Sequence, residues 1–314
     1  MPVSVRPDSM CSTSVSDRAL RPMHNRGSIK FFALSTLKLN SATVPEREIF
    51  PELIKSIKRP SLGSSPRSEA MRSAAGTGRL NSECRRSKDG LMIDSLAALT
   101  ADIIDCFRCP RLVAWREHVA ATKRAAFRDW DYWGRPVPGY GDPEARLVVI
   151  GLAPAAHGGN RTGRIFTGDR SGDWLYGAMY RAGFANQPTS VSRDDGLKLR
   201  DAYVLAAVRC APPDNKPSIE ERDNCQPYMT RELALLPRTR VFVCLGTFAY
   251  DNLARLLGLR PKPRFGHGAE AVLPDGRVVL CSYHPSQQNT FTGRLTEEMF
   301  DSIFSRARQL IEGT

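Results

Sequence analysis

Apolar and polar residues follow two recurring patterns along residues 92–314. Four runs of consecutive apolar residues have the pattern of strands that are buried on both faces of a sheet. These runs cover residues 146–150, 203–209, 241–245 and 277–283. Helical patterns follow them at residues 171–182, 218–236, 247–257 and 296–311. Strands that alternate with helices predict an α/β/α sandwich around a central, mostly parallel four-stranded sheet.

A pair of helices is predicted ahead of the first strand, at residues 93–123. Pro110 interrupts this helical pattern directly after Cys109, and a proline inside a helical pattern ends or kinks the helix. Near the other end of the chain, the turn at residues 274–276 (Pro-Asp-Gly) predicts a hairpin that leads into the last strand.

Residues 1–91 differ in composition from the rest of the chain. Residues 1–90 hold 16 Lys and Arg against 8 Asp and Glu, which is most of the net charge of +12. The segment is rich in Ser, Pro and Arg and has no sustained period, so we expect a disordered basic extension. An organelle transit peptide and a misplaced start, with Met92 as the true first residue, are alternatives. Residues 92–314 are predicted to form the catalytic domain, and no apolar run is long enough to span a membrane.

The eight cysteines fall into three groups. Cys11 and Cys84 lie in the basic extension, and Cys244 and Cys281 lie inside strand-like runs, where a cysteine is usually a small buried hydrophobe. The remaining four are spaced as C-x2-C and C-x14-C. Their spacing alone leaves an iron–sulfur cluster, a zinc ion and no metal as open alternatives. These four are Cys106, Cys109, Cys210 and Cys225.

Three segments rich in unusual polar residues follow directly after predicted strands, at residues 151–169, 210–217 and 284–294. Ligands of such sheets bind at the carboxyl ends of the strands, so these segments should meet at one cleft. The glycine-rich first segment has neither the G-x-x-x-x-G-K-[ST] pattern nor a G-x-G-x-x-G that opens a helix, which argues against a nucleotide-binding loop.

Four motifs occur in order along the chain: CFRCPRL (106–112), GLAPAAHGGNRTGRIFTGD (151–169), VRCAPPDNKP (208–217) and HPSQQNTFTGRL (284–295). Together they resemble the uracil-DNA glycosylase superfamily, and they are most similar to its fifth, iron–sulfur family. The resemblance runs from about Ser95 to the C-terminus and does not cover the basic extension. It implies an enzyme of DNA repair that hydrolyses the N-glycosidic bond of uracil and leaves an abasic site. It also implies a 4Fe-4S cluster on the four cysteines named above.

The resemblance assigns one catalytic position, and the chemistry of the reaction suggests a second. His284 matches the histidine that stabilises the departing base, whose negative charge concentrates on O2. Better-known branches carry an Asp or Asn near the start of the 151–169 loop to position water, whereas this chain has alanines there. We therefore expect Asp169 to support the sugar cation or orient water. An N-cap of the following helix is the alternative role for Asp169.

The remaining site residues are expected to hold the base and the DNA. For the base, the resemblance points to Phe166 as a stacking floor and to Asn215 as a reader of the amide edge. We also expect the loop residues Gly151, Ala153 and His157 to bind the substrate, with a phosphate contact as the alternative for His157. Arg161 and Arg164 are expected to position DNA phosphate or to fix the loop. The segment at residues 287–292 resembles the loop that enters the minor groove. The expected DNA contacts are Arg161, Arg164, Gln287, Asn289 and Arg294.

A pocket without an acidic water-positioner relies less on contacts specific to uracil, so we expect hypoxanthine and other deaminated bases to be accepted too. The expected partners are double-stranded and also single-stranded DNA, and the protein is expected to be a cytoplasmic, nucleoid-associated bacterial monomer. A non-catalytic iron–sulfur protein of the same fold that binds DNA is the alternative, because the basic extension suits phosphate binding.

Overall fold

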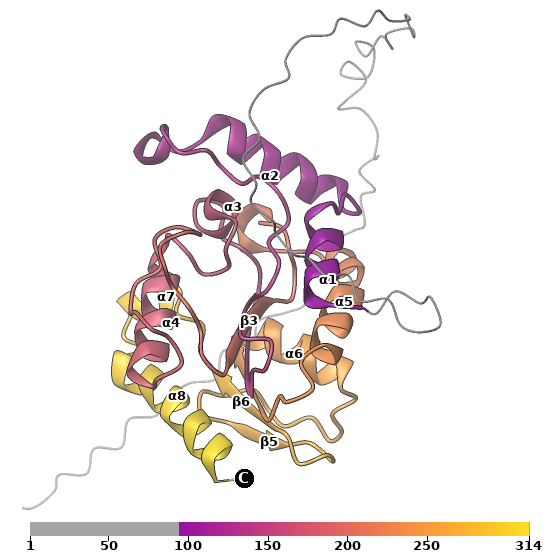
Figure 1. Cartoon of the computed structure of the whole chain (residues 1–314), viewed down its shortest axis with the longest axis vertical. Coiled ribbons are helices and arrows are strands. Elements are labelled where there is room, and N and C mark those ends of the chain that lie inside the picture. Colours follow the sequence, from indigo (N-terminus) through magenta and orange to yellow (C-terminus); the bar gives the residue numbers. More distant parts are fainter. Residues whose placement is uncertain (1–93, 314) are drawn as a thin grey trace, which may run out of the picture. The chain divides into compact units, whose positions relative to one another are not determined.

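The structure, a computed structural model, describes residues 94–313 (Figure 1). The chain divides into two units, residues 1–78 and 79–314, and all of the described residues lie in the second. The predicted disordered extension, residues 1–91, lies outside the described residues. Among residues 94–313, no helix is both long enough and apolar enough to cross a bilayer.

A single sheet of mixed direction forms the centre of the fold, with strand order β1-β3-β2-β4-β6-β5. The four inner strands are parallel, and they correspond to the four strands predicted from sequence. They are β2 (Leu147–Gly151), β3 (Ala202–Ala206), β4 (Val241–Leu245) and β6 (Val278–Ser282). The predicted count of four is corrected to six, because the short antiparallel strands β1 (Tyr140–Gly141) and β5 (Glu270–Val272) extend the two edges.

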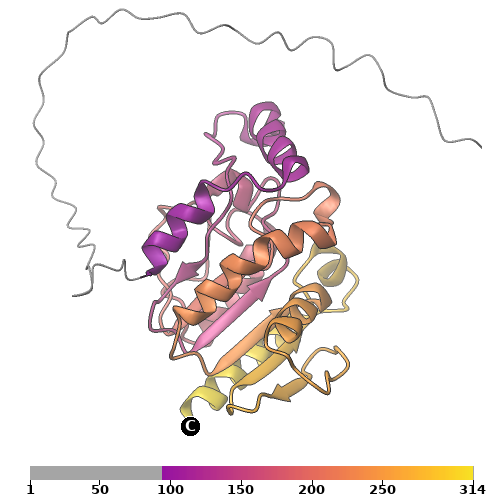
Figure 2. The same cartoon turned by 90° about the vertical axis from the view of Figure 1, so that its right-hand side faces the viewer.

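Both faces of the sheet are covered, as the continuous apolar strands require. Along β2, Leu147 and Val149 face one core and Val148 and Ile150 the other, since successive side chains of a strand point to opposite faces. The first core includes α4 (Arg170–Arg181) and α8 (Glu297–Glu312), and the second includes α5 (Ile219–Ala234) and α6 (Thr247–Leu256). Figures 1 and 2 show the two helical layers on either side of the strands.

The helix break predicted at Cys109 is confirmed. α1 (Leu96–Ile104) ends before the break, and α2 (Pro110–Thr122) begins with Pro110 as its first residue. A proline fits there because the first N–H of a helix has no partner within the helix. α1 packs on α5 through Leu99 and Ile103, which contact Tyr228.

Side-chain caps fix where the helices that flank the site begin. Asp169 caps α4, and Ser218 forms a capping box with Glu221 at the start of α5. Two short helices that the sequence pattern did not predict lie in the loops after the strands. They are α3 (Gly159–Thr162) and α7 (Gln287–Phe291). Helices of one turn are too short to show a period in the sequence.

Candidate active site

The three polar segments predicted to meet at one cleft do so. They line a pocket of about 580 Å³ at the carboxyl ends of the parallel strands. A larger hollow of about 760 Å³ lies at the amino ends of the strands, beside Arg146, Arg240 and Arg277, and holds no histidine. The first pocket is therefore the candidate site. Its walls are formed by Leu152, Ala153, Ala155, Ile165, Phe166, Asp169, Arg170, Ser171, Asp214, Asn215, His284, Ser286, Gln287 and Gln288.

His284 lies two residues beyond the end of β6 and forms part of the pocket wall. Its backbone carbonyl accepts a hydrogen bond of 2.8 Å from the side-chain amide of Asn289, which fixes the loop that carries the imidazole. Burial lowers the pKa of His284 to about 4, because the charged form loses its hydration inside the protein. The imidazole is therefore neutral at neutral pH and carries one N–H that it can donate.

Phe166 forms the apolar side of the same pocket, and its ring centroid lies 5.8 Å from that of His284. Its backbone has a φ of +52°, in the left-handed region where a bulky residue is rare. Gly151 makes room for the ring, since a Cβ at this position would stand 2.7 Å from two ring atoms. Gly151 thus shapes the pocket from beneath Phe166 and is not itself part of the wall. A contact of Gly151 with the base stays a prediction.

Asp169 closes the glycine-rich loop, and its carboxyl group meets both the start of α4 and the pocket. Its Oδ1 accepts a hydrogen bond of 3.0 Å from the backbone N–H of Gly172, which makes it the N-cap of α4. Burial raises the pKa of this carboxyl, against the stabilisation that the backbone N–H groups of Gly172 and Ser171 give to its charged form. The geometry shows the N-cap role, and the carboxyl group also lines the pocket. A single side chain therefore joins the start of the helix to the site.

Asn215 reaches the pocket from the turn after β3, a short 3-10 helix at Pro213–Asn215. Asp214 and Asn215 both have positive φ, +53° and +55°. Asn and Asp adopt this left-handed conformation more readily than other side chains, so the residue types fit the turn. Asp214 lines the pocket too, and the sequence reasoning missed it. The only available signal was its position beside Asn215 in the PPDN turn.

His157 lies outside the pocket wall, among the residues that support it. Its Nδ1 is 3.0 Å from the hydroxyl of Tyr132, in the segment between α2 and β1. Burial lowers the pKa of His157, and the positive charges of Arg124 and Arg161 act in the same direction. The ring therefore ties the loop to a neighbouring segment, and a contact of His157 with the flipped nucleotide or with a phosphate stays a prediction.

Arg161 is also turned inward. Its side chain is buried, and its Nε and Nη2 donate to the backbone carbonyls of His157 and Gly168, at 2.7 and 2.8 Å. Its guanidinium carbon lies 3.9 Å from the ring centroid of Phe127 and 4.0 Å from that of Trp130. Arg161 therefore clamps the two ends of the loop together. The expectation that it grips DNA phosphate is corrected in favour of the alternative, fixing the loop.

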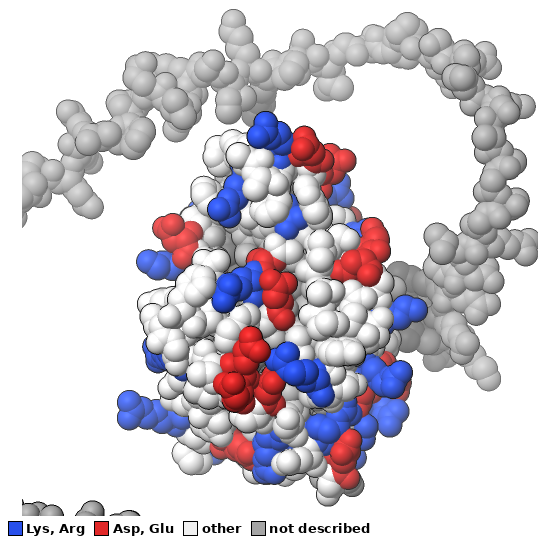
Figure 3. All heavy atoms as spheres, turned by 90° about the vertical axis from the view of Figure 1, so that its left-hand side faces the viewer, with Lys and Arg blue, Asp and Glu red and all other residues white. Residues whose placement is uncertain are grey.

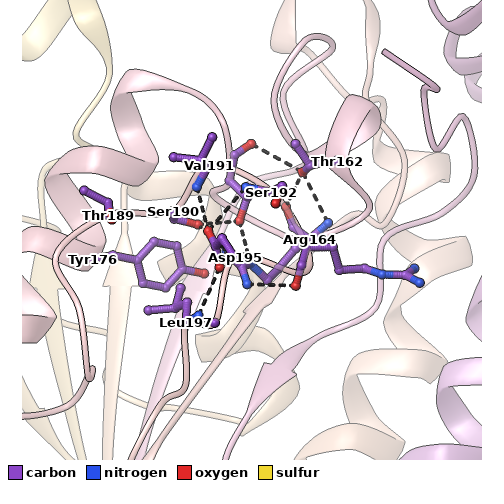
Figure 4. A network of polar contacts seen from close by, with 12 residues as sticks. Thr162, Arg164, Tyr176, Thr189, Ser190, Val191, Ser192, Asp195 and Leu197 are labelled. Carbon is purple, nitrogen blue, oxygen red and sulfur yellow. Dashed lines mark hydrogen bonds and ion pairs between the residues drawn. The ribbon is translucent and has the colours of Figure 1, made fainter.

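Arg164 is corrected in the same way. It is 2% exposed and pairs with Asp195, whose carboxylate lies 2.7 Å away. Asp195 also accepts backbone N–H groups from Val191, Ser192 and Leu197, so the pair anchors the excursion between α4 and β3 (Figure 4). The other two guanidinium nitrogens, Nε and Nη1, donate to the hydroxyl of Thr167 and to the backbone carbonyl of Arg193. Because the guanidinium is buried and each of its nitrogens is bonded within the protein, it faces inward and not toward DNA.

Comparison with known proteins places the chain in a family. The family model described as Uracil DNA glycosylase superfamily matches residues 138–308. The chain belongs to this superfamily. A type-5 uracil-DNA glycosylase of Mycobacterium bovis is 54% identical over 219 residues, which are 69% of this chain and 82% of the relative. The type-5 enzyme of Thermus thermophilus is 53% identical over 214 residues, 68% of this chain and 97% of the relative. The type-5 enzyme of Pyrobaculum aerophilum is 48% identical over 205 residues, 65% and 88% respectively.

Exposed groups of this glycosylase gather around α7, beside the pocket. Gln287 and Gln288 are exposed and form part of the wall. Phe291, at the last turn of α7, is 68% exposed, and the guanidinium carbon of Arg170 lies 4.6 Å from its ring centroid. The side-chain amide of Asn289 donates to the backbone carbonyl of His284, and its expected contact with DNA stays a prediction. Arg294 is exposed and stacks on Tyr283 at 4.6 Å.

Charge on the face of the glycosylase that carries α4, α7 and α8 is mixed. Figure 3 shows basic and acidic side chains interspersed among uncharged ones over the described residues on this face. Arg181 of α4 pairs with Asp301 of α8, and Arg306 of α8 pairs with Glu270 of β5, at 2.6 and 2.8 Å, so these charges neutralise each other. Contacts with phosphate on this face therefore depend on individual groups near the pocket mouth.

The four cysteines of the two spaced pairs line a second, smaller cavity, between α2, α5 and the end of β3. Three of them are buried, and Leu112 and Val208 pack around them. Burial raises the pKa of Cys210 to about 11 and that of Cys225 to about 12. Within residues 94–313, no three His, Cys, Asp or Glu side chains are placed to hold one metal ion between them. All four cysteines contribute to the wall of this cavity.

Ala153 connects the two cavities. It packs against the cysteine cluster and also forms part of the wall of the first pocket. Cys210 lies only five residues before Asn215, so the same turn serves both sites. The pocket and the cysteine cavity are therefore built from neighbouring parts of the same segments. The predicted burial of Cys244 and Cys281 is confirmed, since the two lie side by side in the core on β4 and β6.

Proposed function

We propose that this uracil-DNA glycosylase cleaves the N-glycosidic bond by a dissociative route, in which the base leaves before water adds to the sugar. Bond breaking creates an anion on the base and an oxocarbenium cation on the sugar. The pocket offers a neutral hydrogen-bond donor, His284, for the first and a carboxyl group, Asp169, for the second. Water then adds to the cation and leaves an abasic site.

His284 stabilises the leaving base. A neutral imidazole donates its N–H to O2 of uracil, where the negative charge of the departing base concentrates. A preorganised donor aimed at developing charge, in a site shielded from water, contributes roughly 3 to 4 kcal/mol to catalysis. The low pKa supports this role, because the ring is neutral at the start and needs no deprotonation before the base arrives.

Asp169 supports the sugar cation. The residues at the start of the loop that face the pocket are Ala153 and Ala155, so no acid or amide at these positions can hold the attacking water. A cation that has already formed is a strong electrophile and needs little activation of water. It needs nearby negative charge, and Asp169 with the flanking DNA phosphates supplies it. Asp214 adds a second acidic group to the pocket wall.

Phe166 and Asn215 hold the extruded base. The ring of Phe166 offers a flat apolar surface for stacking, as aromatic side chains do for flipped bases. The amide of Asn215 can donate to O4 of uracil while it accepts from N3–H. Hypoxanthine presents a carbonyl beside an N–H in the same order, so the same amide suits both bases.

Substrate breadth follows from this limited set of base contacts. We infer that the enzyme removes hypoxanthine and other deaminated bases in addition to uracil. Parallel single-turnover assays on duplexes that carry uracil or hypoxanthine test this. A preference for uracil above about 10⁴-fold, the level at which unpaired hydrogen-bond groups reject an analogue, counts against it.

The α7 segment meets the DNA. Phe291 is exposed beside the pocket mouth and is the side chain of α7 best suited to fill the gap left by an extruded nucleotide, since apolar wedges between base steps are a recurring device. Gln287 and Arg294 lie on either side of it and bind the DNA around the lesion. The enzyme works as a cytoplasmic monomer on double-stranded DNA, and also on single strands, where no stack has to be opened.

We propose that Cys106, Cys109, Cys210 and Cys225, which line one cavity, hold a 4Fe-4S cluster. Soft thiolates are the ligands that iron–sulfur clusters take, and the four cysteines would supply four of them. The cluster would be structural here. It would tie α2 to α5 and to the turn that carries Asn215, and ordering a long loop is where a cross-link stabilises most.

The observation that carries the function is the meeting of His284, Phe166 and Asn215 around one pocket, from loops far apart in sequence. The test is a labelled duplex with one uracil, incubated with the protein and then with alkali. We expect strand breakage at the uracil, reduced by about 10²- to 10³-fold in His284→Ala, the loss typical of removing one such donor. Tight binding with an intact strand would favour a non-catalytic DNA-binding protein instead.

A further inference from the structure

Two fully buried arginines flank the cysteine cavity. Arg116 comes from α2 and Arg209 from the end of β3, each is 1% exposed, and both line the cavity. Taking a guanidinium out of water costs several kcal/mol unless a negative group and full hydrogen bonding compensate it. Arginine also keeps its charge in proteins, so it cannot escape this cost by losing a proton.

Arg116 lacks such compensation among the described residues. Its Nη1 donates to the backbone carbonyl of Cys106 and to Sγ of Cys210, each at 3.1 Å. The carboxylate nearest to it belongs to Glu117, at 3.9 Å, and that side chain is 55% exposed and therefore well solvated. The Nε atom is buried with no hydrogen-bond partner among the described residues.

Arg209 is compensated only in part. Its Nη2 pairs with the buried carboxylate of Glu232. The other oxygen of that carboxylate already accepts from the hydroxyl of Tyr203 at 2.9 Å and from the backbone N–H of Gly139 at 3.2 Å. Nε and Nη1 of Arg209 are buried without a partner among residues 94–313. The two arginines together thus leave three buried nitrogen donors unused beside the four thiols.

We propose that Arg116 and Arg209 are the counter-charges of the iron–sulfur cluster and that they raise its reduction potential. This inference rests on the proposed presence of the cluster. The unused N–H groups would donate to its sulfur atoms, and the two positive charges would offset its negative charge. One-electron reduction makes a cluster more negative by one charge. Fixed positive charge and N–H donors stabilise that reduced state more than the oxidised one.

Two substitutions should move the potential in opposite directions. Arg116→Met keeps an unbranched side chain like the stem of arginine but removes the charge and the donors, so the reduction potential should fall. Glu232→Gln removes the negative charge that offsets Arg209, so the potential should rise. Arg108→Met is the control for charge, because Arg108 also lines the cavity but is exposed, and water screens its charge.

The measurement is a redox titration of the purified, cluster-loaded protein, followed by absorbance and by electron paramagnetic resonance. We expect Arg116→Met to lower the equilibrium constant for reduction by at least tenfold, or about 59 mV for one electron, and Arg108→Met to change it by less than threefold. The proposal would be overturned if Arg116→Met and Arg108→Met shifted the reduction potential equally. It would also be overturned if Arg116→Met and Glu232→Gln shifted the potential in the same direction.

Iron and acid-labile sulfide are counted in each sample before the titration. If the wild-type protein contains neither iron nor sulfide, the proposed cofactor is wrong. If the wild-type protein contains the cluster but neither variant shifts its reduction potential, only the proposed role of the arginines is wrong. If Arg116→Met does not retain iron, Glu232→Gln decides alone. A higher potential in that variant supports the proposal, and an unchanged or lower one overturns it.

Discussion

The Asp169 carboxylate lies where a side chain at residue 158 would begin. A Cβ on Gly158 would stand 1.9 Å from Oδ2 of Asp169, far inside van der Waals contact. The other oxygen, Oδ1, is held by the N–H of Gly172. Glycine at position 158 therefore leaves room for the orientation in which the Asp169 carboxyl group both caps α4 and lines the pocket.

Gly158→Ala should displace this carboxyl without unfolding the protein, because the clashing atom is the free end of a side chain. We expect single-turnover excision of uracil to fall by about 10²-fold, the loss that a shift of about 1 Å in a reacting group can cause. Gly159→Ala is the matched control, since its Cβ would meet Pro154 and not Asp169. A Gly158→Ala enzyme as fast as wild type would show that the carboxyl position does not matter.

Asp169→Asn and Asp169→Ala separate the two roles of this residue. Asn is as good an N-cap as Asp, so Asp169→Asn should keep the stability of the protein and lose only the negative charge, with excision slowed by about 10²-fold. Asp169→Ala should lose both, and the free energy of unfolding should fall by about 1 kcal/mol. Urea unfolding and single-turnover assays of both variants measure these effects. Full activity of Asp169→Asn would leave the residue a helix cap only.

The sequence predicted the inner sheet and the meeting of its loops because both follow from local patterns. Runs of apolar residues mark strands buried on two faces, and parallel strands bring their carboxyl ends to one edge. The edge strands β1 and β5 are two and three residues long, too short for a periodic signal. Their existence depends on pairing with β3 and β6, which only the folded chain brings close.

The roles of Arg161 and Arg164 could not be assigned from sequence, because their partners lie far away along the chain. An arginine in a glycine-rich loop looks the same whether it faces phosphate or a buried carboxylate. Arg164 pairs with Asp195, 31 residues further along the chain, and Arg161 stacks between two rings that precede it by more than 30 residues. Neither pairing leaves a local pattern. The motifs placed His284, Phe166 and Asn215 at the pocket because each motif follows a strand, and the carboxyl ends of these strands lie at the same edge of the sheet.

The pH dependence of excision should reflect a neutral His284. With a pKa of about 4, the imidazole keeps its neutral form from the alkaline range down to mildly acidic pH. The single-turnover rate should therefore show no step near the ordinary histidine pKa of 6.5 and should decline only as pH approaches 4. Rates on single-stranded uracil DNA, measured across buffers of constant ionic strength, test this. A step near 6.5 that disappears in His284→Gln would mean that the charged imidazole is the active form.

Protein stability should change with pH through the same residue. The pKa of His284 is lower in the folded protein, about 4, than the value of 6.5 expected when the chain is unfolded. Between these values the unfolded state binds more protons, so stability is full above 6.5 and is lost as pH falls toward 4. His284→Gln removes this term, and its free energy of unfolding should vary less over that window than that of the wild type. Equal slopes for the two proteins would contradict the buried, neutral ring.

Phe291 should matter for duplex DNA and not for single strands. In a duplex the enzyme must unstack a base, which costs a few kcal/mol, and a wedge offsets this by filling the gap. A single strand has no stack to keep open. Phe291→Ala should thus slow excision from a duplex by about tenfold or more and leave excision from a single strand nearly unchanged. The size of the duplex effect follows from the loss of about 1 to 3 kcal/mol of stacking on an aromatic ring.

Tyr180→Ala is the control for this prediction, because Tyr180 is another exposed aromatic residue, 47% accessible, on α4 and outside the pocket wall. Its removal should affect neither substrate. Duplexes with uracil opposite guanine should also be less sensitive to Phe291→Ala than those with uracil opposite adenine, since a mismatched base is easier to extrude. If Phe291→Ala slows both strand forms equally, the ring contributes to binding or to the shape of the pocket through Arg170, and the gap in the duplex is filled by another group.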